Sequence, residues 1–411
     1  MNDKLFETLV ERGYIYQTTD EENVKKILNG EPKAMYVGID PTAESLHIGH
    51  CFPLIIARYL QDAGHKIIVV LGGATAMIGD PSGKTDMRKM VDSDFVNRNR
   101  AKIETIVGKF LKIDGENPVT FVNNADWFKG YDYINFMRDI GVHFNVNKML
   151  ACDAYTRRLE QGGLTFFEMG YMLMQAYDFV RLHEDLGCVL EFGGSDQWAN
   201  IVAGSDLGRK LALINGKEET YEAFTHPLLV NHEGKKMGKT EKGALWVDKN
   251  KTTPYEFYQY FYNVDDKDVE KLFKFLTYVS MEDIAKYMAG DVREAKKVMA
   301  YEVTKLVHGK EEADSAMKQA QDVFSGNDMS NAPEVKLSKD LVFVAIPDLL
   351  VNTKLCASKS DARRMIEQGG VVFNDKKVTD FKQIVTEEDF NDGFAILKKG
   401  KKNIIKVVVE R

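Results

Sequence analysis

The sequence predicts an α/β protein, in which a domain built on a parallel β-sheet precedes a helical domain and a small α+β module. Two short apolar runs, residues 35–39 (MYVGI) and 67–71 (IIVVL), indicate buried strands, and a helical stretch at about 47–63 lies between them. This order is typical of parallel sheets, whose neighbouring strands need a crossover helix. From about residue 253 to 324, apolar residues recur at three- and four-residue spacing, as in EKLFKFLTYV, which indicates helices.

Further strands are expected at 119–122, 188–192 and 226–230, and glycine-rich turns follow the second strand. In an open parallel sheet, ligands bind at the carboxyl ends of the strands. We therefore expect the binding site at that end of the sheet.

The predicted boundaries place the sheet domain at 1–245 and the helical domain at 246–325. Residues 326–340 are polar and contain Gly and Pro, which is typical of a linker. In the module at 341–411, IPDLLVNTKL and SKSDARRMIEQGG indicate two short helices, and VVFNDKKV predicts a hairpin that turns at Asn374 and Asp375.

Composition favours a globular chain of 411 residues, with 44% hydrophobic and 28% charged residues. Its four cysteines are far apart and form no CxxC pair, so neither a zinc site nor a disulfide framework is expected. No apolar run is long enough to span a bilayer and the N-terminus lacks an export signal. We therefore expect a cytoplasmic protein without a membrane partner.

The net charge of −7 does not by itself suggest a nucleic-acid partner. Residues 341–411, however, hold 13 Lys and Arg against 10 Asp and Glu. A basic module on an acidic chain permits contact with RNA without establishing it.

A histidine motif, PTAESLHIGH at residues 41–50, lies between the first predicted strand and the first predicted helix. The free N–H groups and the dipole of a helix N-terminus attract phosphate. His47 and His50 can both face a phosphate there, and Gly49 has no side chain to block a nucleotide. The alternative is a pair of solvent-exposed histidines in a turn.

A lysine-rich loop, KKMGKT at residues 235–240, follows an apolar run. Flexible lysines at such a place can neutralise the charge that builds on departing pyrophosphate. A short lysine run alone is usually a solvated surface, but its occurrence downstream of the histidine motif favours a catalytic loop.

These two motifs resemble the HIGH and KMSKS signatures of class I aminoacyl-tRNA synthetases, and nucleotidyltransferases share HIGH-like motifs. The resemblance implies a Rossmann-like catalytic domain. It also implies that phosphate chemistry is performed by side chains of both motifs: His47, His50, Lys236, Lys239 and Thr240.

The segment GYMLMQAYDF predicts a helix with three polar side chains on one face: Tyr171, Gln175 and Asp178. Steps of four and seven residues bring these side chains within about 40° of each other around the helix axis. An isolated tyrosine and aspartate would more simply be a core residue and a cap. Three aligned polar groups on an apolar helix instead suggest a buried polar pocket. The pattern resembles the tyrosine-binding helix of tyrosyl-tRNA synthetases.

The first strand continues this resemblance. It implies that Tyr36 shares the hydroxyl of substrate tyrosine with Asp178, and that Asp80 joins Tyr171 and Gln175 around the substrate ammonium. A site built to bond a hydroxyl discriminates against phenylalanine, because its own buried groups would be left unpaired. The resemblance also implies ATP contacts from the strand and the turn that follows it, at Gly38, Asp40, Thr42 and Gly49.

GGSDQW at residues 193–198 resembles the ribose-binding turn of that family, which implies nucleotide contacts from Gly194, Asp196 and Gln197. The alternative is a plain helix cap at Ser195 or Asp196.

GDPSGK at residues 79–84 lacks the spacing of a P-loop, because three residues rather than four separate Gly79 and Gly83. The resemblance instead implies that Lys84 and Arg88 act on the ATP phosphates.

The C-terminal module resembles a small RNA-binding domain that is shared with a ribosomal protein. This implies phosphate contacts from Ser358, Lys359, Ser360, Arg363 and Arg364, and a turn at Gly369 and Gly370. A plain accessory fold is the alternative.

Taken over nearly the whole chain, the resemblance implies that L-tyrosine is activated with ATP and transferred to tRNA(Tyr). It implies ATP with Mg²⁺ as co-substrate, no tightly bound cofactor, no metal held by the protein, and a homodimer joined through the sheet domain. The sequence departs from the family pattern at Gly238, Thr240, Pro53 and Val37, none of which removes a catalytic group. A tryptophanyl-tRNA synthetase and a non-catalytic RNA-binding paralogue are the alternatives.

Overall fold

The computed structural model describes residues 4–82, 90–240, 243–325, 334–390, 393–400 and 403–410. The chain forms two compact units. The first comprises Met1–Thr253 with Phe261–Gly309, and the second comprises Pro254–Tyr260 with Lys310–Arg411. The first unit therefore continues past residue 245, where the sequence places a domain boundary.

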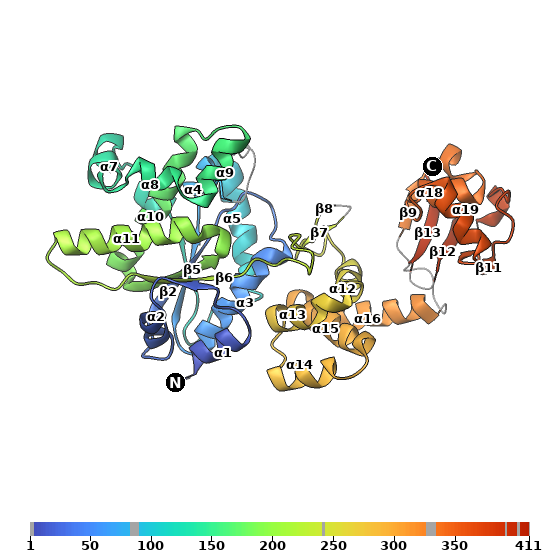
Figure 1. Cartoon of the computed structure of the whole chain (residues 1–411), viewed down its shortest axis with the longest axis horizontal. Helices are drawn as coiled ribbons and strands as arrows, with labels where there is room; N and C mark the ends of the chain where they lie inside the picture. Colours follow the sequence, from blue (N-terminus) through green and yellow to red (C-terminus); the bar gives the residue numbers. More distant parts are fainter. Residues whose placement is uncertain are drawn as a thin grey trace. The chain divides into compact units, whose positions relative to one another are not determined.

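The first unit is built on a six-stranded sheet (Figure 1), in which the strand order is β1-β6-β5-β2-β3-β4. All neighbouring strands are parallel except β1, which pairs antiparallel with β6 at one edge. The strand order reverses direction between β2 and β5, which is where ligands bind in open α/β sheets. The strands are β1 (Gln17–Thr18), β2 (Ala34–Ile39), β3 (Lys66–Leu71), β4 (Thr120–Asn123), β5 (Cys188–Gly194) and β6 (Glu222–His226). The predicted α/β class with a parallel sheet is confirmed.

The strand predicted at 226–230 is displaced, because β6 ends at His226. Pro227 follows, and it has no backbone N–H to donate to a sheet. The preceding residues pair in register with β5 and are all buried.

Helices connect and cover the strands of this sheet. The helix predicted at 47–63 is α3 (Ile48–Asp62), which contacts β3 and β5. The others of the sheet domain are α1 (Leu5–Glu11), α2 (Glu21–Leu28), α4 (Thr75–Ile78), α5 (Ser93–Val107), α6 (Ala125–Phe128), α7 (Tyr133–Asp139), α8 (Val146–Leu150), α9 (Asp153–Gln161), α10 (Phe166–Leu186) and α11 (Trp198–Ile214).

Helix α10 carries most of the predicted amino-acid pocket. It begins at a capping box in which Thr165 and Glu168 each accept from the other's backbone N–H, and it ends at Gly187 in the left-handed conformation. Its Phe179 packs in a buried cluster with Tyr36, and α10 also packs along α11. The helix therefore has both ends fixed and one face against the sheet.

Further helices follow the sheet domain: α12 (Pro254–Tyr262), α13 (Val269–Leu276), α14 (Met281–Met288), α15 (Val292–His308) and α16 (Lys310–Ser325). Helices α13, α14 and α15 pack on one another, and α13 also contacts α3. The predicted helical character of this region is confirmed.

The N-terminal segment binds the carboxyl end of α13. The guanidinium of Arg12, which is 3% exposed, donates to the carbonyls of Lys274 and Thr277 at 2.9 Å and also to that of Val279. The hydroxyl of Tyr14 donates to the Lys274 carbonyl at 2.8 Å. These carbonyls have no partner within the helix, so the first residues of the chain complete the end of a helix about 260 residues later.

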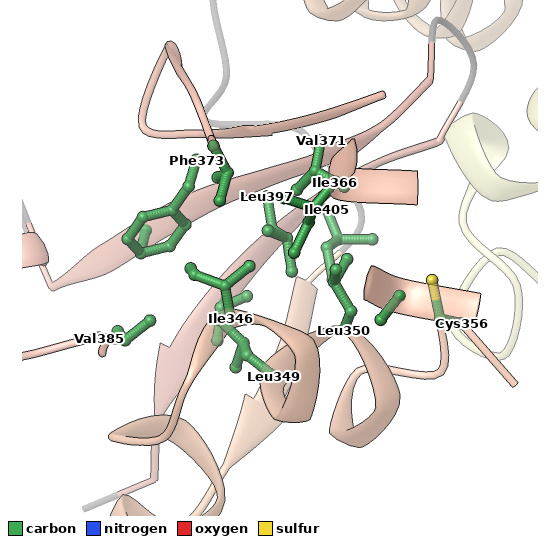
Figure 2. Close-up of a cluster of buried hydrophobic side chains, with 14 of the residues drawn as sticks. Ile346, Leu349, Leu350, Cys356, Ile366, Val371, Phe373, Val385, Leu397 and Ile405 are labelled. Carbon is green, nitrogen blue, oxygen red and sulfur yellow. The ribbon is translucent and has the colours of Figure 1, made fainter. Parts of the chain in front are cut away.

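The second unit contains an α+β module around a five-stranded sheet with the order β11-β10-β12-β13-β9. Figure 2 shows its core, in which apolar side chains of both helices and sheet converge, among them Ile346, Leu350, Ile366, Leu397 and Ile405. Its elements are β9 (Glu334–Leu337), α17 (Lys339–Val342), α18 (Ile346–Asn352), α19 (Lys359–Glu367), β10 (Val371–Phe373), β11 (Lys376–Lys377), β12 (Phe394–Lys399) and β13 (Asn403–Val409).

Part of the segment predicted as a linker is a strand of this module. Residues 334–337 form β9, which pairs parallel with β13, and Val335 and Leu337 pack against the core. Alternating apolar residues in a polar segment explain this difference. Residues 326–333 lie outside the described residues.

The predicted hairpin is confirmed. Phe373 pairs with Lys376, and Asn374 and Asp375 between them have φ of 46° and 60°. Two positive φ values are what a two-residue type I′ turn requires.

In the part of the chain that the structure describes, no helix is both long and apolar enough to cross a membrane.

Candidate active site

A buried carboxylate on α10 lies at the centre of a polar network. Asp178 is 4% exposed, and its two oxygens accept from Trp127 Nε1 at 2.8 Å and from Asn124 Nδ2 at 3.0 Å. Burial raises the pKa of Asp178 well above its usual range, while these two donors act in the opposite direction. The two donors fix the position of the carboxyl group and favour its ionised form, which is the better acceptor.

The hydroxyl of Tyr36 lies beside two carboxylates. It is buried on β2 and has no hydrogen-bond partner among the described residues. Burial raises its pKa, and the nearby charges of Glu191 and Asp178 raise it further. The structure therefore brings together Tyr36 and Asp178, the pair that the sequence predicts for a substrate hydroxyl.

The Asp178 network continues toward the carboxyl end of β2. Asn124 donates to Thr75 Oγ1 at 2.9 Å, and Thr75 donates to Asp40 at 2.8 Å. Tyr171 also donates to Asp40, at 2.9 Å. The predicted tyrosine-binding and ATP-binding residues are thus parts of one hydrogen-bonded array.

A second array surrounds Asp80, which is 5% exposed. Its carboxylate accepts from Gln197 Nε2 at 2.6 Å and from the backbone N–H of Ser82 at 2.9 Å. Asn200 Nδ2 donates to the side-chain oxygen Oε1 of Gln197 at 3.2 Å. The loop after β3 is thereby joined to the turn after β5.

The third predicted residue of α10, Gln175, faces a carboxylate on β5. Its Nε2 donates to Glu191 Oε1 at 3.0 Å. Tyr171, Gln175 and Asp178 thus all point into the polar region beside β2 and β5, as the helical spacing predicts.

The two histidines cap α3. His47 is the N-cap, and its Nδ1 accepts from the backbone N–H of Gly49 at 3.1 Å. The His50 Nδ1 accepts from the backbone N–H of His47 at 3.3 Å, and the two rings lie 3.9 Å apart. A nitrogen that accepts carries no proton, so each neutral ring carries its proton on Nε2. Both rings are therefore Nε2–H donors at a helix N-terminus.

Gly49 has a structural role that the sequence did not indicate. A Cβ at this position would lie 2.9 Å from His47 Cε1, so a larger residue would displace the capping ring. Gly38 is different: it is the exposed residue of β2, and a Cβ there would meet nothing within 4 Å. That open space permits a ligand to approach the end of β2, close to Thr42 in the segment that follows the strand.

Backbone hydrogen bonds join the histidine motif to the lysine loop. Ile48 N donates to the Leu245 carbonyl at 3.1 Å, and Leu245 N donates to the Gly238 carbonyl at 2.7 Å. Gly238 has φ of +85°, and a Cβ there would lie 2.7 Å from Ile48 Cγ2. The departure from the KMSKS pattern at Gly238 is thus explained by a left-handed backbone and a close contact.

Lys236 of the loop contacts the predicted ribose-binding turn, because its Nζ lies 3.1 Å from Asp196 Oδ2. Neither Ser195 nor Asp196 caps α11, whose N-cap, Gln197, makes no side-chain capping bond. The alternative of a plain helix cap is therefore wrong. Gly194 leaves room for this turn, since a Cβ there would lie 2.9 Å from Asp196 Oδ1.

A cavity of about 680 Å³ adjoins this turn. Ser195, Asp196 and Trp198 line one part of it, and the cations Lys148, Arg157 and Lys210 are also in its wall. The carboxylates Asp153, Asp196 and Asp206 are in the same wall, so charges of both signs line the cavity.

Comparison with known proteins agrees with this geometry. The family described as tRNA synthetases class I (W and Y) matches residues 28–325, which is more than half of the chain. The chain belongs to this family. A second description, Tyrosine--tRNA ligase SYY-like C-terminal domain, matches residues 326–407.

Individual members of the family are similar over their full length. A Tyrosine--tRNA ligase of Clostridium tetani is 48% identical over all of both chains. One of Acetivibrio thermocellus is 49% identical over 98% of each. Among solved structures, a C-terminally truncated mitochondrial tyrosyl-tRNA synthetase of Aspergillus nidulans is 30% identical with a TM-score of 0.69, covering 78% of this chain and 94% of that one.

A tryptophanyl-tRNA synthetase of Encephalitozoon cuniculi bound to tryptophan shares the fold alone. It is 16% identical with a TM-score of 0.55, and covers 80% of this chain and 94% of that one.

Several predicted synthetase residues lie outside the description. Lys84 and Arg88 fall in the undescribed segment 83–89, and the side chains of Lys239 and Thr240 are not described. Among described residues, no group of three or more His, Cys, Asp or Glu is placed to hold a metal ion.

Several residues that hold this site together belong to none of the sequence motifs. Asn124 and Trp127 hold Asp178, Thr75 links Asn124 to Asp40, and Glu191 binds Gln175. Two signals were available. Asn124 lies two residues beyond a predicted strand, and Glu191 is a charge within the otherwise apolar strand CVLEF.

The predicted RNA contacts lie on one helix of the C-terminal module. Ser358 caps α19 by accepting from Asp361 N at 3.2 Å, so its hydroxyl is engaged in the fold. Arg363 and Arg364 are exposed, as are Lys359 and Ser360. The Arg363 guanidinium lies over the Phe381 ring at 5.5 Å, which leaves its edges available for phosphate.

Proposed function

We propose that this protein activates L-tyrosine with ATP, giving tyrosyl-adenylate and pyrophosphate, and then transfers tyrosine to the 3′-terminal ribose of tRNA(Tyr). The observation that carries the proposal is the buried Tyr36 hydroxyl beside the Asp178 carboxylate. Such a pair is built to bond a phenol, and its Tyr36 member lies on β2, the strand that precedes the histidine motif. The similar proteins named as tyrosine ligases support the same substrate.

The tyrosine carboxylate attacks the α-phosphate of ATP in line, without a covalent enzyme intermediate. The two Nε2–H donors of His47 and His50 stabilise the charge that develops on the phosphorus centre. ATP enters with Mg²⁺ as a co-substrate, and no tightly bound cofactor takes part. The lysines and arginine of the two loops, Lys84, Arg88, Lys236 and Lys239, hold the departing pyrophosphate, and Thr240 adds a hydroxyl.

The ammonium of tyrosine binds among Asp80, Tyr171 and Gln175, and the ATP ribose binds at Asp196 and Gln197. The ion pair of Lys236 with Asp196 supports a nucleotide that passes between the lysine loop and the ribose turn. These contacts position the reactants, which is most of what this reaction needs.

The tRNA contacts several parts of the chain. Its acceptor end brings the 3′-terminal ribose to the tyrosyl-adenylate. The region 246–325 binds toward the anticodon side, and the exposed cations of α19 grip phosphates from the module at 341–411. We expect this synthesis to take place in the cytoplasm.

The protein acts as a homodimer joined through the sheet domain. Large apolar side chains are exposed along its α7–α10 region, at Tyr133, Ile134, Val142, Val146, Leu159, Phe166 and Phe167. Several large exposed apolar side chains on consecutive helices are typical of an interface. Light scattering should give a dimer for the wild type and a monomer for Val142→Asp. Leu213→Asp, at an equally exposed apolar residue of α11, should remain dimeric.

The deciding measurement is exchange of labelled pyrophosphate into ATP with tyrosine, phenylalanine or tryptophan. Exchange with tyrosine alone supports the proposal, and exchange with tryptophan would favour the tryptophanyl alternative. A lack of exchange with every amino acid would favour a non-catalytic RNA-binding paralogue.

A further inference from the structure

Three buried polar atoms without hydrogen-bond partners among the described residues gather in the amino-acid pocket. They are Tyr36 Oη on β2, Gln175 Oε1 on α10 and Glu191 Oε2 on β5. Tyr36 and Glu191 are direct partners in the parallel ladder, and Gln175 donates to the other oxygen of Glu191 at 3.0 Å. Buried polar groups are nearly always paired, so three together on three elements indicate that a ligand completes them.

Glu191 is the member of this group that neither the motifs nor the chemistry proposed above uses. It is 2% exposed, and the adjacent residues of β5, Leu190 and Phe192, are fully buried. Helix α11 passes over it at Gly204, where a Cβ would lie 3.3 Å from Glu191 Oε2. A buried carboxylate is destabilising unless it is paired, and folding alone would be served better by an apolar residue.

We propose that Glu191 is a positioning residue of the tyrosine pocket, which turns the carboxamide oxygen of Gln175 toward the substrate ammonium and controls the direction of the Tyr36 hydroxyl proton. This inference rests on the function proposed above.

The orientation of Gln175 follows from the chemistry of its partner. An ionised carboxylate only accepts hydrogen bonds, so the amide NH₂ of Gln175 must face Glu191. Its Oε1 then points away from Glu191 and remains an unpaired acceptor. An ammonium group is the donor that such an oxygen binds.

The direction of the Tyr36 proton depends on the charge of Glu191. An ionised Glu191 attracts the Tyr36 O–H, and the substrate hydroxyl then loses that donor. A protonated Glu191 can donate to the Tyr36 oxygen, which leaves the Tyr36 O–H for the substrate.

Glu191 is close to the midpoint of its titration at neutral pH. Burial raises its pKa to about 7, while the neighbouring Gln175 amide and Tyr36 hydroxyl act to lower it. The groups that face it are Tyr36 from β2, Gln175 and Asp178 from α10, and uncharged Gly204 from α11. None of them is a cation that would hold it ionised.

The test compares Glu191→Gln and Glu191→Met with the wild type by measuring the dissociation constant of tyrosine between pH 6 and 8. In the wild type, tyrosine should bind about three- to tenfold more weakly at pH 8 than at pH 6, the value of one hydrogen bond. Glu191→Gln accepts from Gln175 and donates to Tyr36 at every pH, so its affinity should equal that of the wild type at pH 6 and stay flat.

Glu191→Met removes both interactions. Tyrosine affinity should fall about tenfold or more at each pH, and discrimination against phenylalanine should fall with it. A merely structural role of Glu191 would change neither the pH profile nor the discrimination. Phenylalanine is the matched ligand, because it has no hydroxyl and should show no pH step in the wild type.

Tyrosine-dependent pyrophosphate exchange by the wild type is measured first, and its absence would overturn the proposed function itself. If the wild type exchanges but its tyrosine affinity is flat with pH, or if Glu191→Gln keeps the step, the inference about Glu191 is wrong. Should Glu191→Met fail to fold, Glu191→Gln decides the question alone.

Discussion

Trp127→Phe tests how strongly the pocket depends on the network around Asp178. The substitution keeps an aromatic ring but removes the Nε1–H that donates to Asp178 Oδ1 at 2.8 Å. The carboxylate is buried, so no water replaces the lost donor, and the pKa of Asp178 should rise further. A carboxyl group that holds its own proton accepts poorly from the hydroxyl of tyrosine.

The expected magnitude follows from the charge of the acceptor. A hydrogen bond to a charged group contributes about 1.5–3 kcal/mol, and each 1.4 kcal/mol is about tenfold in affinity. If all of this loss appears in substrate binding, the KM for tyrosine rises about 10- to 100-fold. Phenylalanine makes no bond to Asp178, so discrimination between the two amino acids should fall by the same factor.

The assay is pyrophosphate exchange with each amino acid at a fixed pH. Tyr14→Phe is the matched control, because it also removes one buried hydrogen bond, to the Lys274 carbonyl, in the same compact unit. It should lower stability by about 1 kcal/mol and leave the KM for tyrosine unchanged. A Trp127→Phe enzyme whose discrimination stays within twofold of the wild type would refute this account of Asp178.

Three further substitutions test other parts of the structure. Gly238→Ala should lower the exchange kcat about tenfold or more, because its φ of +85° disfavours a side chain and its Cβ would displace Ile48 beside the histidines. Burial lowers the pKa of His226 from 6.5 to about 4, so the unfolded chain binds more protons than the folded chain between these pH values. The free energy of unfolding of the wild type, measured by denaturant titration, should therefore fall by about 3 kcal/mol as pH drops from 6.5 to 4. His226→Phe should remove this dependence on pH. Arg363→Glu with Arg364→Glu should reduce tRNA charging at least tenfold and leave pyrophosphate exchange unchanged.

Each of these has a control in the same chain. Gly234→Ala has a similar φ of +79° but open space around its Cβ, so it should keep its activity within about twofold if the Ile48 contact is decisive. An unchanged pH slope in His226→Phe would assign the acid sensitivity to other groups. Lys336→Glu with Lys339→Glu makes the same charge change on exposed residues of the module. If this variant loses as much tRNA charging, the net charge of the module, and not the position of the two arginines on α19, explains the loss.

The sequence predicted the elements that local patterns determine. The spacing of Tyr171, Gln175 and Asp178 placed them on one helix face, and Asn374 with Asp375 indicated a two-residue turn. Both follow from backbone geometry within a few residues. The strand at 222–226 was displaced in the prediction because apolar character continues past Pro227, while sheet pairing does not.

The residues that the sequence analysis missed depend on contacts between distant segments. Asn124 and Trp127 belong to the pocket because β4 lies next to β3 in the sheet, which directs them to a helix some 50 residues later. The contact of Gly238 with Ile48 likewise joins residues 190 positions apart. No local periodicity carries such information, so three-dimensional structure was needed to find them.

The contacts of Arg12 with the carboxyl end of α13 also bear on how the chain is made. A ribosome exposes Arg12 early, but the carbonyls of Lys274, Thr277 and Val279 emerge only after more than 260 further residues. Until then the Arg12 guanidinium must stay hydrated. Contacts of such long sequence separation slow folding and leave apolar surface uncovered in the meantime. The segment of Arg12 and Tyr14 is therefore among the first to be synthesised and among the last to complete its native contacts.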